Sequence, residues 1–229
     1  MRVAMVQNIL SLVPIFSDLD EEALAKIAER MQKRTYPKNK MILMEEDKGD
    51  TFFILDKGSV KVTRISEDGR EIILSILHEG DFFGEMTILD GEARSANVVS
   101  LEETEVFVLH RTDFLDIVEQ YPRISVMILQ ELAGRIRKSD TLIESLSLGD
   151  AEERIGLTLL RIAEDQGIYK SGSVFIESLP YQQEIANMAG TSRETVSRTL
   201  KMFEDQGLIE KEGHQLTIHQ YEEFKSSFS

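Results

Sequence analysis

The stretch QQEIANMAGTSRETVSRTL (residues 182–200) has the spacing of two short helices joined by a tight turn. Ala186 is small at the point where two crossing helices would approach each other. Gly190 stands where the turn needs a positive φ, which glycine adopts readily, and Ser192 is a favoured N-cap for a second helix. The apolar positions that would form the core between the helices are Ile185, Ala189, Val196 and Leu200. A plain helical hairpin would not need a small residue, a glycine and a cap at these offsets together, so the stretch predicts a helix-turn-helix.

The second of these helices carries side chains that can contact DNA. An arginine can donate two hydrogen bonds to a guanine, and a glutamate can accept one from a cytosine. Phosphates would repel Glu194, so this residue fits a base contact better than a backbone contact. The residues of this helix predicted to contact DNA, on the face opposite Val196 and Leu200, are Arg193, Glu194, Ser197 and Arg198. The alternative is a solvated charged face in which Glu194 pairs with Arg198, four residues later.

The sequence on both sides of the motif extends this prediction. Asp150 can cap a helix that runs to about Gln166, and residues 208–218 have the pattern of a β-hairpin around Glu212-Gly213. A hairpin that follows a helix-turn-helix indicates a wing. Residues 149–229 are therefore predicted to form a winged helix-turn-helix domain.

The composition excludes several classes of protein. The chain has 229 residues, a net charge of −15 and no cysteine, which excludes disulfides, cysteine-bound zinc, iron–sulfur clusters and thiol catalysis. The negative charge argues against non-specific binding of nucleic acid or an anionic membrane, but not against a protein whose few cations gather on one element. Because no long apolar run and no secretory leader are evident, we expect a cytoplasmic protein without a membrane partner.

No catalytic site and no metal site are predicted. His78, His110, His214 and His219 are scattered along the chain without a cluster of metal ligands, and no nucleophile has a base at a suitable spacing. The protein is therefore predicted not to be an enzyme. A small β-roll enzyme with a helical appendix is the alternative from a different class.

The first half of the chain is rich in short β-type runs. An amphipathic helix is predicted over residues 18–34, with Asp18 or Asp20 as its cap. The predicted strands that follow, separated by turn signals rich in glycine and aspartate, are 41–44, 51–55, 60–63, 72–77 and 106–109. Many short strands at nearly regular spacing predict a barrel, roll or sandwich.

A long helix is predicted over residues 122–148, with Pro122 at its start. Its apolar residues recur at alternating three- and four-residue steps, with one serine in the series, which is the pattern of a heptad seam. The seam consists of Leu129, Leu132, Ile136, Ser139, Ile143 and Leu146. Pairing with a second copy would remove these side chains from water, so the seam predicts a homodimer. The alternative is a helix packed within its own chain.

The stretch from Phe83 to Ala96 combines groups that suit a ligand with a hydroxyl and an anionic part. Arg94 and Ser95 can donate hydrogen bonds to a phosphate. Glu85 cannot help to bind a phosphate, but it can accept a hydrogen bond from a sugar hydroxyl. The alternative is a Glu85–Arg94 salt bridge with no ligand.

Nearly the whole chain, from about residue 16 onward, resembles the CRP/FNR superfamily of bacterial transcription regulators. The resemblance rests on residues 49–60, on Phe83-Gly84-Glu85 with Arg94-Ser95-Ala96, and on residues 192–206. It implies an α+β fold: a cyclic-nucleotide-binding β-roll as effector domain (residues 1–121), a dimerisation helix (122–148) and a winged helix-turn-helix domain (149–229). It also implies binding of double-stranded DNA as a dimer, and RNA polymerase as a partner.

The resemblance implies roles for individual residues. A cyclic nucleotide, with cyclic AMP as the first candidate, would be the effector. Its ribose 2′-hydroxyl would contact Glu85 beside the Gly84 amide, and its phosphate would contact Arg94 and Ser95. The other implied effector contacts, all on the long helix, are Arg135, Ser139 and Asp140. In the second domain, Arg193, Glu194 and Arg198 would recognise a TGTGA-like half-site, and Gln183, Ser192 and Thr195 would contact phosphates.

Three departures from the family pattern bear on these roles. Ser139-Asp140 stands where the family has a Thr-Ser pair that contacts adenine, so a different effector, or none, is an alternative. Gln182 and His214 stand where the family has basic residues, which predicts a shallow salt dependence of DNA binding.

An alternative of another class is a cyclic-nucleotide-binding module that regulates a protein partner. The helix-turn-helix argues against this alternative.

Overall fold

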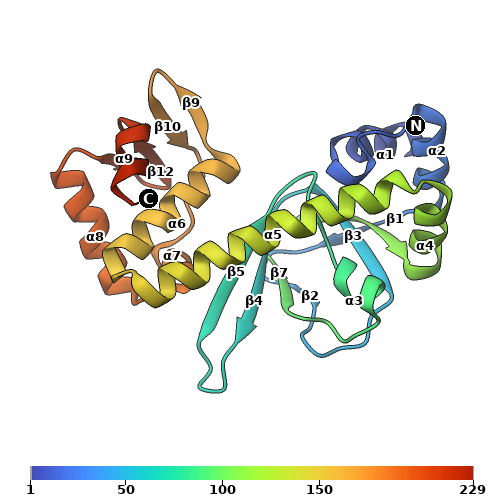
Figure 1. Ribbon diagram of the computed structural model, residues 1–229, viewed down its shortest axis with the longest axis horizontal. Helices are drawn as coiled ribbons and strands as arrows, with labels where there is room; N and C mark the ends of the chain where they lie inside the picture. Colours follow the sequence, from blue (N-terminus) through green and yellow to red (C-terminus); the bar gives the residue numbers. More distant parts are fainter. Residues whose placement is uncertain (1, 229) are drawn as a thin grey trace. The chain divides into compact units, whose positions relative to one another are not determined.

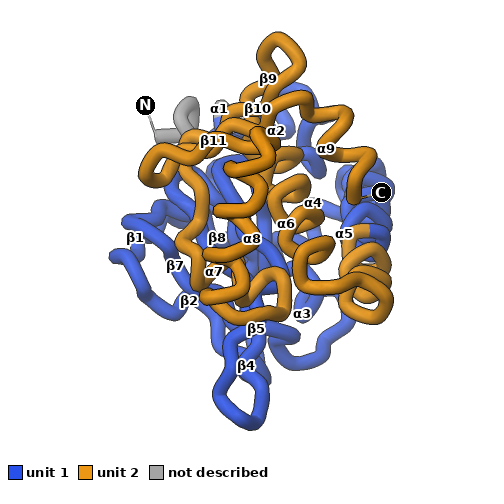
Figure 2. The backbone as a smooth tube through the Cα atoms, turned by 90° about the vertical axis from the view of Figure 1, so that its left-hand side faces the viewer, with its two compact units in different colours: residues 1–137 blue, residues 138–229 orange. Residues whose placement is uncertain are grey.

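A computed structural model describes residues 2–228, apart from the side chains of residues 2–5 and 8. The chain divides into two compact units, one up to residue 137 and the other from residue 138 onward, which are coloured separately in Figure 2. The dividing point lies inside helix α5 (Arg123–Leu148), so this helix contributes to both units. The functional division into residues 1–121, 122–148 and 149–229 stays a prediction.

The first unit contains the β-rich region that the sequence predicted, as a pair of antiparallel sheets among its described residues (Figure 1). One sheet has the strand order β1 (Gln32–Tyr36), β8 (Thr104–His110), β3 (Thr51–Lys57) and β6 (Phe82–Phe83). The other has the order β2 (Met41–Leu43), β7 (Asn97–Ser100), β4 (Val60–Ile65) and β5 (Glu71–Leu77).

Strand β3 shows why this unit holds together. Side chains alternate between the two faces of a strand. Phe53 and Leu55 point into an apolar cluster between the sheets, whereas Phe52 and Ile54 point into a second cluster that the helices cover. Strand β8, its neighbour, alternates in the same way. Burial on both faces explains why the sequence of β3 is a continuous apolar run instead of an alternating one.

The helices that cover the second cluster are α1 (Arg2–Leu12), a 3₁₀ turn (Pro14–Phe16), α2 (Glu21–Arg30), α4 (Arg111–Gln120) and the first turns of α5. Helix α2 is shorter than the predicted helix over residues 18–34. It begins after Asp20, whose carboxylate accepts a hydrogen bond from the Ala23 amide at 2.8 Å, and it ends at Arg30 because Gln32 already starts strand β1. Helices α1 and α3 (Glu85–Asp90) were not predicted.

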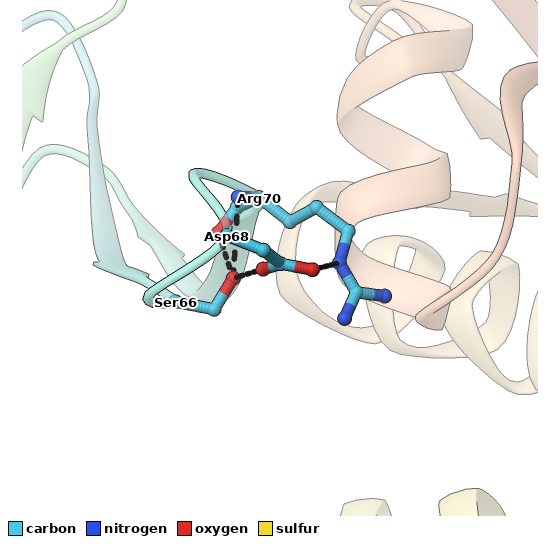
Figure 3. A network of polar contacts seen from close by, with 3 residues as sticks. All are labelled: Ser66, Asp68 and Arg70. Atoms are coloured by element: carbon cyan, nitrogen blue, oxygen red, sulfur yellow. Dashed lines mark hydrogen bonds and ion pairs between the residues drawn. The ribbon is translucent and has the colours of Figure 1, made fainter.

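The β4–β5 hairpin ends in a tightly bonded turn, which Figure 3 shows. The Ser66 amide donates to the Arg70 carbonyl at 2.9 Å, and the Asp68 carboxylate accepts from the Ser66 hydroxyl and from Nε of Arg70. Gly69 completes the turn with φ of 80°. These contacts fix the register of the hairpin.

The second unit is a helical domain with a small sheet. Helix α6 (Ala151–Gln166) packs against α7 (Gln182–Ala189) and α8 (Arg193–Asp205). The sheet has the strand order β11 (Ile209–Glu212), β12 (Gln215–Ile218), β10 (Ser173–Ile176) and β9 (Ile168–Lys170), and helix α9 (Tyr221–Ser227) follows. The predicted wing is confirmed: β11 and β12 form a hairpin whose turn contains Gly213 with φ of 60°. Within residues 2–228, no helix combines the length and apolar character needed to span a bilayer.

Candidate effector site and DNA interface

The turn between β6 and α3 positions the first candidate site. Gly84 has φ of 83° and directly precedes Glu85, the first residue of α3. A Cβ on Gly84 would lie 2.9 Å from the Thr51 carbonyl oxygen, so both the backbone conformation and the available space require glycine. The turn directs the Glu85 side chain inward, where it is 2% exposed.

Arg94 is the central cation of this site and is 4% exposed. Its Nη1 donates to the Gly84 carbonyl at 2.9 Å, and its Nη2 donates to the carbonyl and hydroxyl oxygens of Thr51 at 2.9 and 3.1 Å. Burial lowers the pKa of Arg94, and the carboxylates of Asp50 and Glu85 oppose this shift. Its hydrogen bonds go to neutral oxygens and not to a carboxylate. The positive charge of the guanidinium can therefore pair with an anionic ligand.

Glu85 pairs with Arg135 of helix α5. Nη1 of Arg135 lies 2.7 Å from Oε1 of Glu85, and Nη2 donates to the Phe82 carbonyl at 2.9 Å. The guanidinium also lies 4.8 Å from the centre of the Phe82 ring, within cation–π range. Within the described chain no ion pair joins Glu85 to Arg94, so the simple salt bridge between them is not formed. The site therefore offers a carboxylate that can accept from a hydroxyl and a cation that can bind an anion.

The remaining predicted effector residues lie outside this buried group. Ser95 is exposed, and its hydroxyl lies 3.6 Å from the Met86 sulfur. Ser139 and Asp140 are exposed on the turn of α5 after Arg135 and belong to the second unit. The structure thus brings together Gly84, Glu85, Arg94 and Arg135.

Three residues of the site were not singled out from the sequence. Thr51 holds Arg94 with two oxygens, and Phe82 holds Arg135 with its carbonyl and ring. Gly49 leaves room for Arg94, since a Cβ there would lie 2.3 Å from Nε and Nη2 of that guanidinium. Gly49 and Thr51 lie inside residues 49–60, one of the stretches on which the family resemblance rests. This resemblance was the signal from which both residues could have been identified.

Helix α5 exposes the apolar residues of the predicted seam. The exposed fractions of Leu129, Ile136, Ile143 and Leu146 are 65, 61, 62 and 48%. Leu132 is partly buried against the first unit's core, and Ser139 is exposed. A row of exposed Leu and Ile on one helix is an apolar surface that would be covered at an interface.

The helix-turn-helix has the geometry that the sequence predicted. Helix α7 ends at Ala189, and its C-cap Gly190 has φ of 60°. Helix α8 begins after Ser192, whose hydroxyl accepts from the Thr195 amide at 3.2 Å. The predicted core residues Ile185, Ala189, Val196 and Leu200 are all buried. These contacts hold α8 at a defined angle to α7.

The polar face of α8 is open to solvent. Arg193, Glu194, Ser197 and Arg198 are exposed. Nη2 of Arg198 lies 3.5 Å from the Thr195 hydroxyl, and no Glu194–Arg198 ion pair is found among residues 2–228. A hydrogen bond from its own backbone amide and one from the Ser192 hydroxyl lower the pKa of the Glu194 carboxyl. On α7, the Gln183 amide donates to Asn187 at 2.9 Å.

Comparison with known proteins assigns both units. Residues 33–121 match the family model of the cyclic nucleotide-binding domain, and residues 153–226 match that of the Crp-like helix-turn-helix domain. The chain is 30% identical over 213 residues to a CRP-like cAMP-activated global transcriptional regulator of Mycobacterium tuberculosis, covering 93% of this chain and 95% of that protein. It is 34% identical over 196 residues to the cyclic AMP receptor protein of Thermus thermophilus, covering 86% of this chain and 88% of that protein.

A solved structure shows the same fold. A CooA mutant from Carboxydothermus hydrogenoformans superposes with a TM-score of 0.76 at 24% identity, covering 88% of this chain and 89% of that one. The α+β fold predicted from the sequence is confirmed. The chain therefore belongs to the CRP/FNR family of transcription regulators, which are not enzymes, with a cyclic nucleotide-binding domain followed by a helix-turn-helix domain.

Proposed function

We propose that the protein is a homodimeric, cytoplasmic transcription regulator whose β-roll binds a cyclic nucleotide and whose second unit recognises a TGTGA-like palindrome. The observation that carries this proposal is the 2.7 Å pair between Glu85 and Arg135. It joins a carboxylate suited to a ribose hydroxyl to the helix that carries the predicted dimer seam. A ligand that contacts Glu85 therefore acts on that helix directly.

The buried group supplies the main ligand contacts. Glu85 accepts from the ribose 2′-hydroxyl beside the Gly84 amide, and Arg94 binds the cyclic phosphate together with Ser95. Arg135 orients Glu85 and carries the effect of the ligand to α5. Ser139 and Asp140, on the next turn of this helix, contact the base. Cyclic AMP is the first candidate because the two relatives described above are named for it.

The seam of α5 forms the dimer interface. Pairing Leu129, Leu132, Ile136, Ser139, Ile143 and Leu146 with a second copy removes their exposed apolar surface from water. Two copies of α8 then face successive major grooves, with half-sites one helical turn of DNA apart. Arg193, Glu194, Ser197 and Arg198 contact bases, while Gln183, Ser192 and Thr195 contact phosphates. RNA polymerase is the protein partner of the DNA-bound dimer.

A ligand screen combined with a DNA-binding assay tests this proposal. Cyclic AMP, cyclic GMP and cyclic dinucleotides are added singly to the purified protein while its melting temperature is measured, because a ligand of the native state raises that temperature. A mobility-shift assay on a TGTGA palindrome, with a scrambled duplex as control, follows with and without each ligand. A monomer, or a dimer that does not distinguish the two duplexes with any ligand, would refute the proposal.

In a second candidate function, the protein is the same transcription regulator but its effector is not cyclic AMP. Asp140 adds a carboxylate where the family has a serine, and a carboxylate can accept from an amino group of either purine. An Asp140→Ser variant, with the exposed Asp68→Ser as a charge-matched control, separates the two candidates. If cyclic AMP is the effector, Asp140→Ser retains or improves its binding. If the carboxylate selects another ligand, only Asp140→Ser loses that ligand.

DNA binding should depend only weakly on salt. Gln182 and His214 replace cations, and the His214 ring packs edge-on against Tyr181, 4.7 Å between ring centres. Fewer phosphate contacts release fewer counterions. We expect a log–log slope much shallower than the value of about −9 that about ten phosphate contacts would give. Fluorescence anisotropy of a labelled palindrome between low and high potassium chloride measures it, and a slope as steep as −9 contradicts the expectation.

A further inference from the structure

The second unit contains a cavity of 280 Å³ that belongs neither to the effector site nor to the DNA-binding face. It lies among the last turns of α5, helix α6, the end of α7 and α9. Its apolar walls are Leu142, Leu157, Leu160 and Ala189. This volume approaches the lower end of the range for small-molecule sites, about 300 Å³, and such sites are mostly apolar with a few placed polar groups.

Four of the five charged residues that line this cavity are cations (Lys138, Arg154, Arg161 and Lys225), and Glu164 is the fifth. Arg154 and Arg161 lie seven residues apart on α6, about two turns, so both reach the same side of the helix. Nε and Nη1 of Arg154 donate to the carbonyls of Ala189 and Gly149 at 2.9 and 2.8 Å. Nη2 of Arg161 is buried and has no hydrogen-bond partner among the described residues. Neither guanidinium forms an ion pair with a carboxylate within residues 2–228.

The lack of an ion pair at these two arginines is unusual because the chain has 41 acidic and only 26 basic residues. The lysines that line the same cavity do pair: Lys138 with Asp165 at 3.0 Å and Lys225 with Glu164 at 3.3 Å. Burial lowers the pKa of Arg161, and the carboxylate of Asp165, which is paired with Lys138, opposes this shift only in part. A buried cation is stable only when an anion or hydrogen-bond acceptors compensate for the lost water.

The cavity stays accessible when α5 dimerises. The residues of α5 that line it are Lys138, Thr141, Leu142 and Ser145. The seam residues in the same stretch are Ser139, Ile143 and Leu146. On a helix of 3.6 residues per turn these two sets occupy different faces. Pairing through the seam therefore does not require that the cavity be filled by the second copy.

We propose that this cavity binds a small organic anion with an apolar body, such as a medium-chain carboxylate or phosphate monoester. The anionic head contacts the guanidinium of Arg161 and the remaining N–H groups of Arg154. The apolar body lies against the leucines of α5 and α6. Because α5 also carries the seam, the ligand would bind next to the helix that joins the two copies. The proposal stands independently of the identity of the cyclic nucleotide.

Isothermal titration of the full-length protein tests the proposal with four probes: octanoate, octyl phosphate, octanol and inorganic phosphate. We expect at least one of the two amphipathic anions to bind, and octanol and inorganic phosphate to bind at least about tenfold more weakly, since charge-assisted hydrogen bonds and apolar burial are both needed. Comparison of octanoate with octyl phosphate identifies the preferred head group. Equal binding of octanol and both anions, or no binding of either anion, would overturn the proposal.

Two substitutions in the cavity locate the binding, and two outside it serve as controls. Arg161→Gln should weaken the anion at least about tenfold, whereas Arg70→Gln, which removes an equally charged but exposed side chain of the first unit, should leave it unchanged. The chain has no tryptophan, so Leu157→Trp places a single fluorescent reporter in the cavity, and its emission should shift on addition of the anion. Arg94→Ala should retain anion binding. An unchanged affinity in Arg161→Gln, or a silent reporter while heat is released, would overturn the assignment.

Discussion

Arg94 of the β-roll and the arginines of helix α8 have the same charge but opposite environments. Arg94 is 4% exposed and donates three hydrogen bonds to oxygens of Gly84 and Thr51. Arg193 and Arg198 are exposed, and the contact of Arg198 with Thr195 is long, at 3.5 Å. The first environment fixes a cation before a ligand arrives, whereas the second leaves cations free to adjust to a partner.

This difference matches the ligands that the two sites would bind. The cost of removing water from Arg94 is already met in the folded chain, so a small anion gains from a preorganised cation. Arginines on α8 lose water only when they meet DNA, and there they find both base edges and phosphates. Substitution of Arg94 should therefore strongly reduce the affinity for one small ligand. Each substitution on α8 should reduce the affinity and the sequence specificity for DNA by a moderate amount.

The largest effect is expected for Arg94→Ala. Each hydrogen bond to a charged group contributes about 1.5–3 kcal/mol, so loss of the phosphate contacts should weaken the cyclic nucleotide at least about 100-fold. Isothermal titration with the nucleotide found in the ligand screen measures this. Circular dichroism should show a retained fold, because the roll is held by two apolar clusters that do not include Arg94. An unchanged titration would remove Arg94 from the site.

A moderate effect is expected for Arg198→Ala on α8. Loss of one bidentate contact to a guanine should cost about 1–3 kcal/mol of discrimination against the wrong base. Competition between the TGTGA palindrome and duplexes with single base changes measures it. Lys201→Ala, on the same helix but paired with Asp205 at 2.8 Å, is the control and should retain the base preference. Equal loss on all duplexes would assign Arg198 to the phosphate backbone instead.

A smaller effect is expected for Gly49→Ala, which retains Arg94 but displaces it. The new methyl group would lie 2.3 Å from the guanidinium, so the side chain must shift. We expect nucleotide affinity to fall about tenfold, which corresponds to about 1.4 kcal/mol. Gly69→Ala is not a suitable control because Gly69 has φ of 80°, whereas Gly134→Ala adds a methyl group in open space and should leave the affinity unchanged. A loss as large as that of Arg94→Ala would indicate that the roll itself is disturbed.

The sequence predicted those features that depend on neighbouring residues. Gly190 and Ser192 define the turn and the cap of the helix-turn-helix within a few positions, and the strands with a glycine turn between them were found for the same reason. Helix α2 was predicted too long because its apolar spacing continues beyond Arg30, where pairing of β1 with β8 overrides the helical pattern.

Contacts between residues far apart in the sequence could not be predicted from such local patterns. Thr51 and Arg94 lie 43 positions apart, and the hydrogen bond between them uses a backbone carbonyl, which every residue has. The Glu85–Arg135 pair spans 50 positions. The family resemblance implied that Arg135 contacts the effector, but not that it pairs with Glu85. Residue chemistry alone left open a pair between Glu85 and Arg94, which the fold resolves by giving each a different partner.

The smallest effect is expected at the exposed Asp68–Arg70 pair of the β4–β5 turn, which extends the comparison to a third environment (Figure 3). The Ser66 hydroxyl and the Arg70 guanidinium lower the pKa of the Asp68 carboxyl from its ordinary value of 3.8. A carboxyl with a lowered folded-state pKa stabilises the fold above that ordinary value, and the contribution is lost as the pH falls through the folded-state pKa. Asp68→Asn removes the charge and retains one of the two acceptor oxygens that Ser66 and Arg70 contact. The variant should melt slightly below the parent at neutral pH, and the gap should narrow as the pH falls below 3.8 and close once the Asp68 carboxyl is protonated in the folded chain. Added salt should narrow the gap at neutral pH because both side chains are exposed. Differential scanning calorimetry at several pH values measures the gap. A gap that persists at low pH would mean that the turn depends on the shape of the Asp68 side chain, and not on its charge.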